Sequence, residues 1–175
     1  MTLSPRLRKA VLTAHVTLAV GWLGAVAGFL AIAIAGLASE DAQVVRSVYV
    51  SMGIIARFVI VPLSFAPLVT GPILSLGTPW GLFRHYWILA KLAITVLSTI
   101  VLQVHMRPIN LLADAAVTSA GLSADLRTAQ VQIVVASVAA VLALLAATAL
   151  GVYKPRGMTR YGWRKQYEER TVPVP

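Results

Sequence analysis

Four long apolar segments constrain this chain more than any other feature of its sequence. They cover roughly 11–37, 50–75, 86–106 and 130–153. Each is long enough to cross the hydrocarbon core of a bilayer, which takes about 20 apolar residues in helical form. Backbone groups in lipid must be hydrogen-bonded internally, so runs of this kind form helices. The sequence therefore predicts an all-α, polytopic membrane protein with a four-helix transmembrane bundle over 1–153.

Composition excludes most other classes of protein. Of the 175 residues, 58% are hydrophobic and 12% are charged, whereas a soluble domain carries about a quarter charged residues. The absence of cysteine excludes disulfides, iron–sulfur clusters and thiolate metal sites. The net charge of +9 would indicate nucleic acid in a soluble protein. Here it indicates membrane orientation and anionic lipid headgroups, and no nucleic-acid partner is expected.

Basic residues fall mainly on one side of the predicted spans. On that side are Arg6, Arg8, Lys9, Arg84, Lys154, Arg156, Arg160, Arg164, Lys165 and Arg170. Arg46, Arg107 and Arg127 lie on the other side. The positive-inside rule then places both termini in the cytoplasm, in a bacterial inner (plasma) membrane. The segment 154–175 is predicted to be a basic cytoplasmic tail that lies on anionic headgroups and then frays.

Local signals predict helix boundaries outside the bilayer. Ser39 precedes two acidic residues, and Ser123 stands in a similar position before the fourth span. Both serines are therefore predicted to be helix N-caps. A short surface helix is expected over Leu111–Val117, within the 107–122 loop. Three prolines in the second span, at 62, 67 and 72, predict a kinked or broken helix.

Polar side chains recur at helical spacing inside the spans. At about 100° per residue they form stripes, which predicts a polar bundle interior; the stripes comprise Arg57, Ser64, Thr95, Ser98, His105, Gln130, Ser137 and Thr148. The alternative is that serine and threonine bond to carbonyls of their own helix. On the first span Gly21, Gly24 and Gly28 share a different face, which predicts close packing against another helix.

Two basic residues are embedded in the spans without an acidic partner. Lys91 lies near the cytoplasmic side and Arg57 near the outer side, and no Asp or Glu lies inside any span. Such a cation needs water, carbonyls, lipid phosphate or an anionic ligand, or it snorkels to the interface. The absence of acids excludes a carboxylate proton relay.

Histidine is the remaining residue type that could bind a metal. His15 and His105 are the candidate ligands. His105 lies 14 residues beyond Lys91, about 21 Å along the helix, so His15 and His105 cannot ligate one iron. The choices left for haem are His15 with His85, His15 alone, or His105 separately.

Two short segments carry a family resemblance. The segment 15–24, with a His followed by Trp-x-Gly, resembles the first helix of the CopD and HemJ group of small bacterial membrane proteins. The segment 86–92, where a Trp precedes a Lys-Leu pair, and His105 at the helix end are similar to the group's third helix. HemJ-type proteins are four- or five-helix haem-b proteins that oxidise protoporphyrinogen, and CopD-type proteins are associated with copper uptake. The resemblance implies that His15 matches the group's helix-one histidine and Lys91 its helix-three lysine.

Three functions remain open from the sequence. The first is a haem b protein, a redox carrier or HemJ-like, or a protein that holds another anionic ligand. Its predicted site comprises His15, Trp22, Arg84, His85 and Lys91, with Lys91 and Arg84 pairing with propionates. The second is a non-catalytic accessory protein that packs on a membrane partner or on itself. The third is a channel or carrier for a small anion or a metal. Whether the chain is an enzyme stays open.

Overall fold

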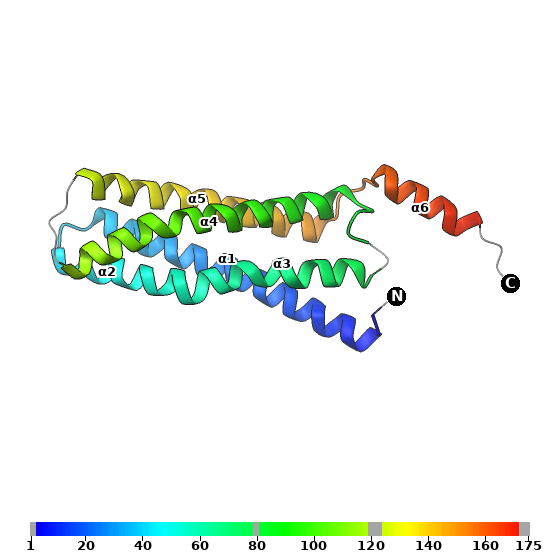
Figure 1. Cartoon of the computed structure of the whole chain (residues 1–175), viewed down its shortest axis with the longest axis horizontal. Helices are drawn as coiled ribbons and strands as arrows, with labels where there is room; N and C mark the ends of the chain where they lie inside the picture. Colours follow the sequence, from blue (N-terminus) through cyan, green and yellow to red (C-terminus); the bar gives the residue numbers. More distant parts are fainter. Residues whose placement is uncertain (1–2, 79–80, 119–123, 172–175) are drawn as a thin grey trace.

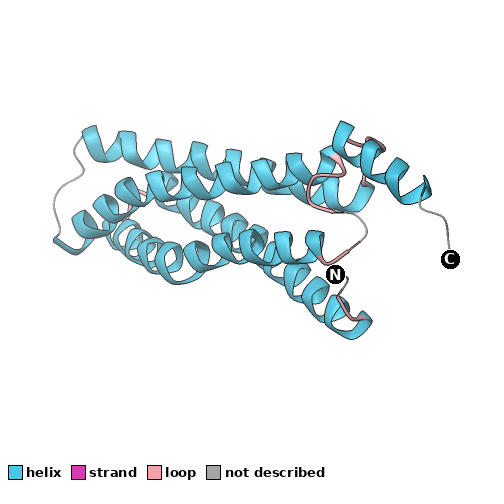
Figure 2. Cartoon of the chain, turned by 45° about the vertical axis from the view of Figure 1, so that its right-hand side comes forward, coloured by secondary structure: helices cyan, strands magenta, loops and turns pink. Residues whose placement is uncertain are grey.

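The computed structural model describes residues 3–78, 81–118 and 124–171, and these residues are almost entirely helical (Figure 2). The elements in chain order are α1 (Pro5–Ala38), α2 (Ala42–Ile55), the π-helical turn η1 (Ala56–Ile60), α3 (Val61–Leu76), α4 (Tyr86–Thr118), α5 (Ala124–Tyr153) and α6 (Arg160–Thr171).

Four helical segments form an elongated bundle, as the sequence predicted. Each is long and apolar enough to cross a membrane, and α2, η1 and α3 together make the second of them. Both ends of the chain lie at the same end of the bundle (Figure 1), which we call the terminal end; the opposite end is the distal end. The four segments pack as a square, in which α1 and α4 each contact α2, α3 and α5 and face each other across the diagonal.

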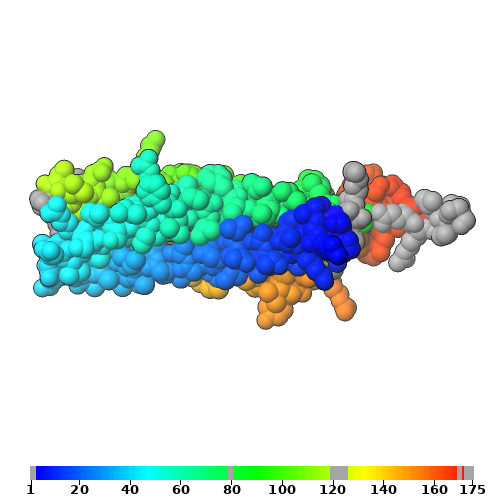
Figure 3. Space-filling view, turned by 90° about the horizontal axis from the view of Figure 1, so that it is seen from below, coloured from blue at the N-terminus to red at the C-terminus, as the bar shows by residue number. Residues whose placement is uncertain are grey.

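α1 begins earlier than the predicted span because its N-terminus is well capped. Ser4 accepts a hydrogen bond from the backbone N–H of Leu7 at 3.4 Å, and Pro5 occupies the first turn. Proline suits that position because its missing N–H would have no helical partner there. α1 lies along one face of the molecule beside the α2–η1–α3 segment (Figure 3).

The N-cap of α2 is Asp41, so the prediction of Ser39 was wrong. The Asp41 carboxylate accepts from the N–H groups of Gln43 at 2.7 Å and Val44 at 3.4 Å. Ser39 is the C-cap of α1, and its hydroxyl accepts from the Asp41 N–H at 3.2 Å. A carboxylate reaches two free N–H groups at a positive helix end, which favours it over the hydroxyl. Ser123, the other predicted cap, lies outside the described residues.

The second span is distorted where the prolines predict it. The N–H of Val61 bonds to the carbonyl of Ala56, five residues back, which defines the π-turn η1. Pro62 follows directly in the first turn of α3, and Pro67 and Pro72 lie inside that helix. Proline has no N–H to donate and crowds the preceding turn. Wider turns of this kind commonly interrupt α-helices at functional sites.

α4 does not end where the sequence analysis expected. It continues through Pro108 to Thr118, so the separate surface helix over Leu111–Val117 is wrong, and those residues form the last part of one long helix. Ile109 and Leu112, just beyond the proline, are buried in the core. That packing outweighs the hydrogen bond lost at Pro108.

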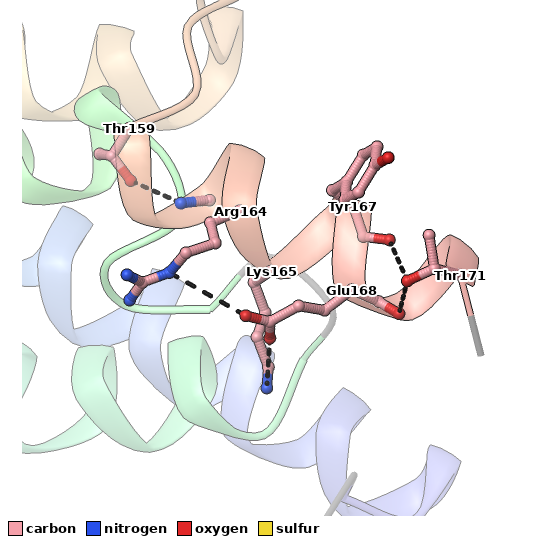
Figure 4. Close-up of polar contacts among 7 residues, drawn as sticks. Thr159, Arg164, Lys165, Tyr167, Glu168 and Thr171 are labelled. Carbon is pink, nitrogen blue, oxygen red and sulfur yellow. Dashed lines mark hydrogen bonds and ion pairs between the residues drawn. The ribbon is translucent and has the colours of Figure 1, made fainter.

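Within the described residues, most of the predicted tail is helical. α6 extends beyond the terminal end of the bundle (Figure 1). Thr159 caps it, because its hydroxyl accepts from the Gly162 N–H at 3.0 Å (Figure 4). Further along the helix, Arg164 and Lys165 lie 4.0 and 3.6 Å from the Glu168 carboxylate (Figure 4).

The apolar core fills the distal half of the bundle. α1 contributes Trp22, Val26 and Phe29, which pack with Met52 of α2 and Ile133 of α5. Inside a bilayer such contacts stabilise the bundle by van der Waals packing, because lipid tails are as apolar as these side chains. The polar groups of the terminal half lie around a cavity of their own.

Candidate functional site

His15 on α1 makes a contact with α3 that fixes its hydrogen-bonding state. Its Nδ1 atom lies 2.8 Å from Oγ1 of Thr70, and the same Oγ1 lies 2.8 Å from the carbonyl oxygen of Ala66. A carbonyl can only accept, so the single hydroxyl proton of Thr70 points to Ala66. His15 Nδ1 must then be the donor to Thr70. The free lone pair of the neutral imidazole is therefore on Nε2.

Gly71 lets the imidazole approach α3 this closely. A Cβ atom at Gly71 would lie 3.3 Å from Cε1 of His15, closer than a comfortable van der Waals contact. Thr70 thus accepts the hydrogen bond from His15, and Gly71 leaves room for the imidazole ring because it has no side chain. The sequence analysis missed Thr70; its signal was a threonine adjacent to a glycine in a proline-rich span.

Lys91 on α4 approaches the end of α5. Its Nζ atom lies 3.0 Å from where a Cβ of Gly151 would be, in the last turn of α5. The terminal carbonyls of a helix carry a partial negative charge that favours a nearby cation. α5 has no basic residue in its own last turn, so Lys91 supplies that charge from a neighbouring helix. Lys91 is half-buried and has no ion pair with a carboxylate among the described residues.

His15 and Lys91 line one cavity at the terminal half of the bundle, which we call the proximal cavity. Its volume is about 510 Å³, within the size range of small-molecule sites. Arg8 and Lys154 also line it, and the described lining residues include no acid. Much of the remaining wall is apolar, and includes Leu12, Val16, Pro67, Trp87, Ile88 and Leu92. The proximal cavity therefore suits an anion with an apolar body.

Several residues that the sequence predicted to share one polar interior line a second cavity, which we call the distal cavity. It measures about 890 Å³ and is lined by Trp22, Ser98, His105 and Ser137 among mostly apolar residues. His105 donates from Nδ1 to the carbonyl of Val101, one turn back, at 2.8 Å. The stripe from Lys91 to His105 is thus divided between two cavities.

Most of the predicted interior stripe lies inside the bundle. Ser64, Thr95, Gln130 and Ser137 are buried, and Ser98, His105 and Thr148 are half-buried. Several of these groups bond to their own helix, as the alternative interpretation held: Ser64 to Val61, Thr95 to Lys91, and Thr148 to Leu144. Thr99 was not predicted from the sequence; its hydroxyl donates to the Thr95 carbonyl of its own helix at 2.9 Å and also lies 3.3 Å from the Ser64 carbonyl oxygen on α3.

Arg57 is the member of the stripe that the structure places elsewhere. It is exposed, and the residue before it, Ala56, is fully buried. The expectation counted 100° per residue from Ser64 back to Arg57. The π-turn between them has more residues per turn, which rotates the preceding residues about the helix axis. Ala56 therefore takes the inward position that the sequence assigned to Arg57.

Arg84 and His85 lie in the connection before α4, outside the residues that line the proximal cavity. The backbone N–H of Thr159 donates to the Arg84 carbonyl at 2.9 Å, and His85 forms a β-bridge with Met158. The Thr159 hydroxyl also donates to the Phe83 carbonyl. These residues fasten the tail to the connection rather than face a ligand beside Lys91.

Trp22 and the glycines of α1 have different surroundings. The Trp22 indole is buried in the core cluster, and its Nε1 has no hydrogen-bond partner among the described residues. Gly21, Gly24 and Gly28 are exposed, and a Cβ atom on any of them would meet nothing within 4 Å. The glycine face is thus not used for packing within the described chain.

Metal ligation has to be considered one histidine at a time. His15 and His105 line different cavities. The described residues contain no group of three or more His, Asp or Glu side chains that could hold a metal ion. A metal bound by His15 would therefore have to bring other ligands with it.

Comparison with protein-family models, curated proteins and solved structures finds no match to this chain.

Proposed function

We propose that this chain binds an anionic ligand with a large apolar body in the proximal cavity, and that the ligand is haem b. The observation that carries the proposal is the hydrogen-bonding state of His15, whose Nδ1 donates to Thr70 and whose Nε2 keeps its lone pair. Histidines that bind metals almost always donate their other N–H to an oxygen in this way. The bond orients the ring and fixes the tautomer before a metal is present.

The charges around the proximal cavity support the same ligand. Arg8 and Lys91 line it beside His15, and no acid is present among the described lining residues to neutralise them. A porphyrin carries two carboxylates on an apolar ring system, so its charge and its surface both match this wall. Lys91 would pair with a carboxylate, while Leu12, Ile88 and Leu92 would contact the ring.

Bound haem would supply an iron that accepts and returns one electron. The residues of this chain would orient it, exclude water through the apolar wall and set the ligand of the iron through His15. We propose that the chain does this in the bacterial inner membrane, with the terminal end of the bundle on the cytoplasmic side.

An absorption spectrum tests the proposal. The full chain is expressed with a haem precursor, purified in detergent, and measured oxidised and then reduced with dithionite. We expect a Soret band that is lost in His15→Ala and kept in His105→Ala. His105 is a matched control because it donates from the same ring nitrogen but lines the distal cavity. A featureless wild-type spectrum despite haem supply would overturn the proposal.

The exposed glycine face of α1 favours a second candidate function, that of an accessory protein packing on a membrane partner or a second copy. Three glycines lower helix propensity, and the described chain does not use the space they leave. Gly24→Leu with Gly28→Leu is then expected to change the mass of the purified assembly in light scattering while the fold is kept. An unchanged mass, with the same co-purifying proteins, would remove this function.

A further inference from the structure

We propose that Arg57 and Arg107 form a binding site for the headgroup of an anionic phospholipid on the outer flank of the distal half of the bundle. Arg57 belongs to η1, which packs against α4, and Arg107 belongs to α4. Both side chains are exposed, and neither has an ion pair or a hydrogen bond with the described residues. The inference is independent of the ligand in the proximal cavity.

Two interhelical contacts place the arginines at the same height. On the distal side, a Cβ at Gly53 would lie 3.0 Å from Cβ of Ala113. On the terminal side, the Thr99 hydroxyl oxygen lies 3.3 Å from the Ser64 carbonyl oxygen. Arg57 lies about a third of the way from the first contact to the second. The same fraction of the way along α4 falls within about one residue of Arg107.

The two arginines also share a flank of the bundle. Arg57 lies one turn beyond Gly53 and is displaced from the line that joins the helices towards the exposed side. Arg107, counted at about 100° per residue from Ala113, lies about 120° from that line. The helices are antiparallel, so both displacements fall on the side turned away from α1. The burial of Ala56, the residue before Arg57, agrees with this direction.

The height of the pair matches a membrane interface. Trp87 lies in the first turn of α4 at the terminal end, and aromatic residues typically mark the boundary of the hydrocarbon core. Arg107 lies 20 residues further along the same helix, about 30 Å, which is the thickness of that core. The guanidinium groups therefore lie at the opposite boundary, where lipid phosphates are found.

The surroundings select a lipid rather than a free anion. On the same flank, towards the bilayer centre, Phe65, Val96 and Ile100 are exposed and offer a surface for acyl chains. Asp114, also on this flank, lies about 10 Å beyond Arg107 along the helix. Two neighbouring cations in a low-dielectric region need a compensating charge, and a phosphate ester accepts paired hydrogen bonds from guanidinium.

Lipid retention by the full chain tests the site. The protein is held in detergent micelles with equal amounts of phosphatidylglycerol and phosphatidylcholine, and bound lipid is counted by native mass spectrometry. We expect retention of phosphatidylglycerol to fall about five-fold for each arginine replaced by glutamine, and about twenty-five-fold in Arg57→Gln with Arg107→Gln. Equal retention of both lipids by the wild type, or unchanged retention in the double variant, would overturn the proposal.

A matched control removes the same charge at the same end. Arg46 and Arg127 are also exposed, and each donates to a backbone carbonyl, of Val117 and Leu37 respectively. Arg46→Gln with Arg127→Gln is expected to leave phosphatidylglycerol retention unchanged; an equal loss would show a general charge effect and overturn the site. Inorganic phosphate is titrated separately, and competition at millimolar concentration would overturn the assignment to a lipid.

Two further measurements do not depend on the glutamine variant folding. Arg57→Lys with Arg107→Lys keeps the charge and is expected to keep most of the lipid. In the wild type, phosphatidylglycerol with a photoreactive headgroup is expected to label peptides covering 54–61 and 100–108. Labelling confined to other peptides would contradict the proposal.

Discussion

His15 Nδ1 lies 2.8 Å from Thr70 Oγ1, and because the Thr70 hydroxyl donates to Ala66, the imidazole must be the donor in this contact. A helix of the second span thus determines which nitrogen of a first-span histidine is free. His105 reaches a comparable state by donating to its own helix. Only the His15 hydrogen bond joins two helices. A substitution on α3 can therefore remove it while His15 itself is kept.

Thr70→Val is expected to lower haem retention although His15, the proposed ligand of the iron, is kept. The valine keeps the shape of the side chain but cannot accept the Nδ1 proton, which costs about 1 kcal/mol and frees the ring to rotate or change tautomer. The measurement is the ratio of Soret to protein absorbance, with reduced spectra for both proteins. Thr148→Val is the control, because Thr148 lines the proximal cavity but its hydroxyl donates to the Leu144 carbonyl of its own helix and not to His15. Equal retention in the two variants would contradict the role of Thr70.

Lys91→Met is expected to leave the fold intact and abolish ligand retention. Methionine keeps the length and apolar stem of lysine but offers no cation to a carboxylate. Mass spectrometry of the purified protein measures the bound ligand. Gly151→Ala should weaken retention in the same direction, because the new Cβ would lie 3.0 Å from Nζ and displace it. Unchanged ligand content in Lys91→Met would remove Lys91 from the site.

Gly36→Ala is expected to destabilise the bundle, whereas Gly28→Ala is not. A Cβ at Gly36 would lie 2.6 Å from Cγ1 of Val48 and 3.2 Å from the Tyr49 ring, and crowding of this kind costs typically 1–3 kcal/mol. Gly28 has open space and gains helix propensity with alanine. Thermal unfolding in detergent compares the two variants. A lower midpoint for Gly28→Ala than for Gly36→Ala would contradict the packing described for α1.

Thr159→Val is expected to release α6 from the terminal end of the bundle. The substitution removes the cap on the Gly162 N–H and the bond to the Phe83 carbonyl, and loss of an N-cap costs about 1 kcal/mol. Trypsin should then cleave faster after Arg164 and Lys165. The control is Thr171→Val, since the Thr171 hydroxyl bonds within α6 to Tyr167 and Glu168 (Figure 4). Identical cleavage rates for the two variants would show that the Thr159 contacts do not hold α6 in place.

The four spans were predictable because each depends on a property that one segment carries alone. The predicted ranges lie within or close to the helices of the structure, and the distortion of the second span followed from Pro62, Pro67 and Pro72. Helix ends were less predictable. Asp41 and Ser39 are both good N-cap residues, so the sequence did not decide between them. α4 continues through Pro108 because the burial of Ile109 and Leu112 outweighs the backbone hydrogen bond lost at the proline. The helical tail required the Thr159 contacts, which join residues about 75 positions apart in sequence.

The sequence by itself determined that this chain forms four helical segments long and apolar enough to cross a membrane, and which of them carry cations without acids. Length, apolarity and charge are properties of each segment alone. The tertiary structure decided which polar groups share a cavity, because that depends on the rotation and register of one helix against another. The π-turn turns Arg57 to the exposed side of its helix, and the close approach at Gly71 joins His15 to Thr70. Neither relationship follows from the spacing of residues along one helix.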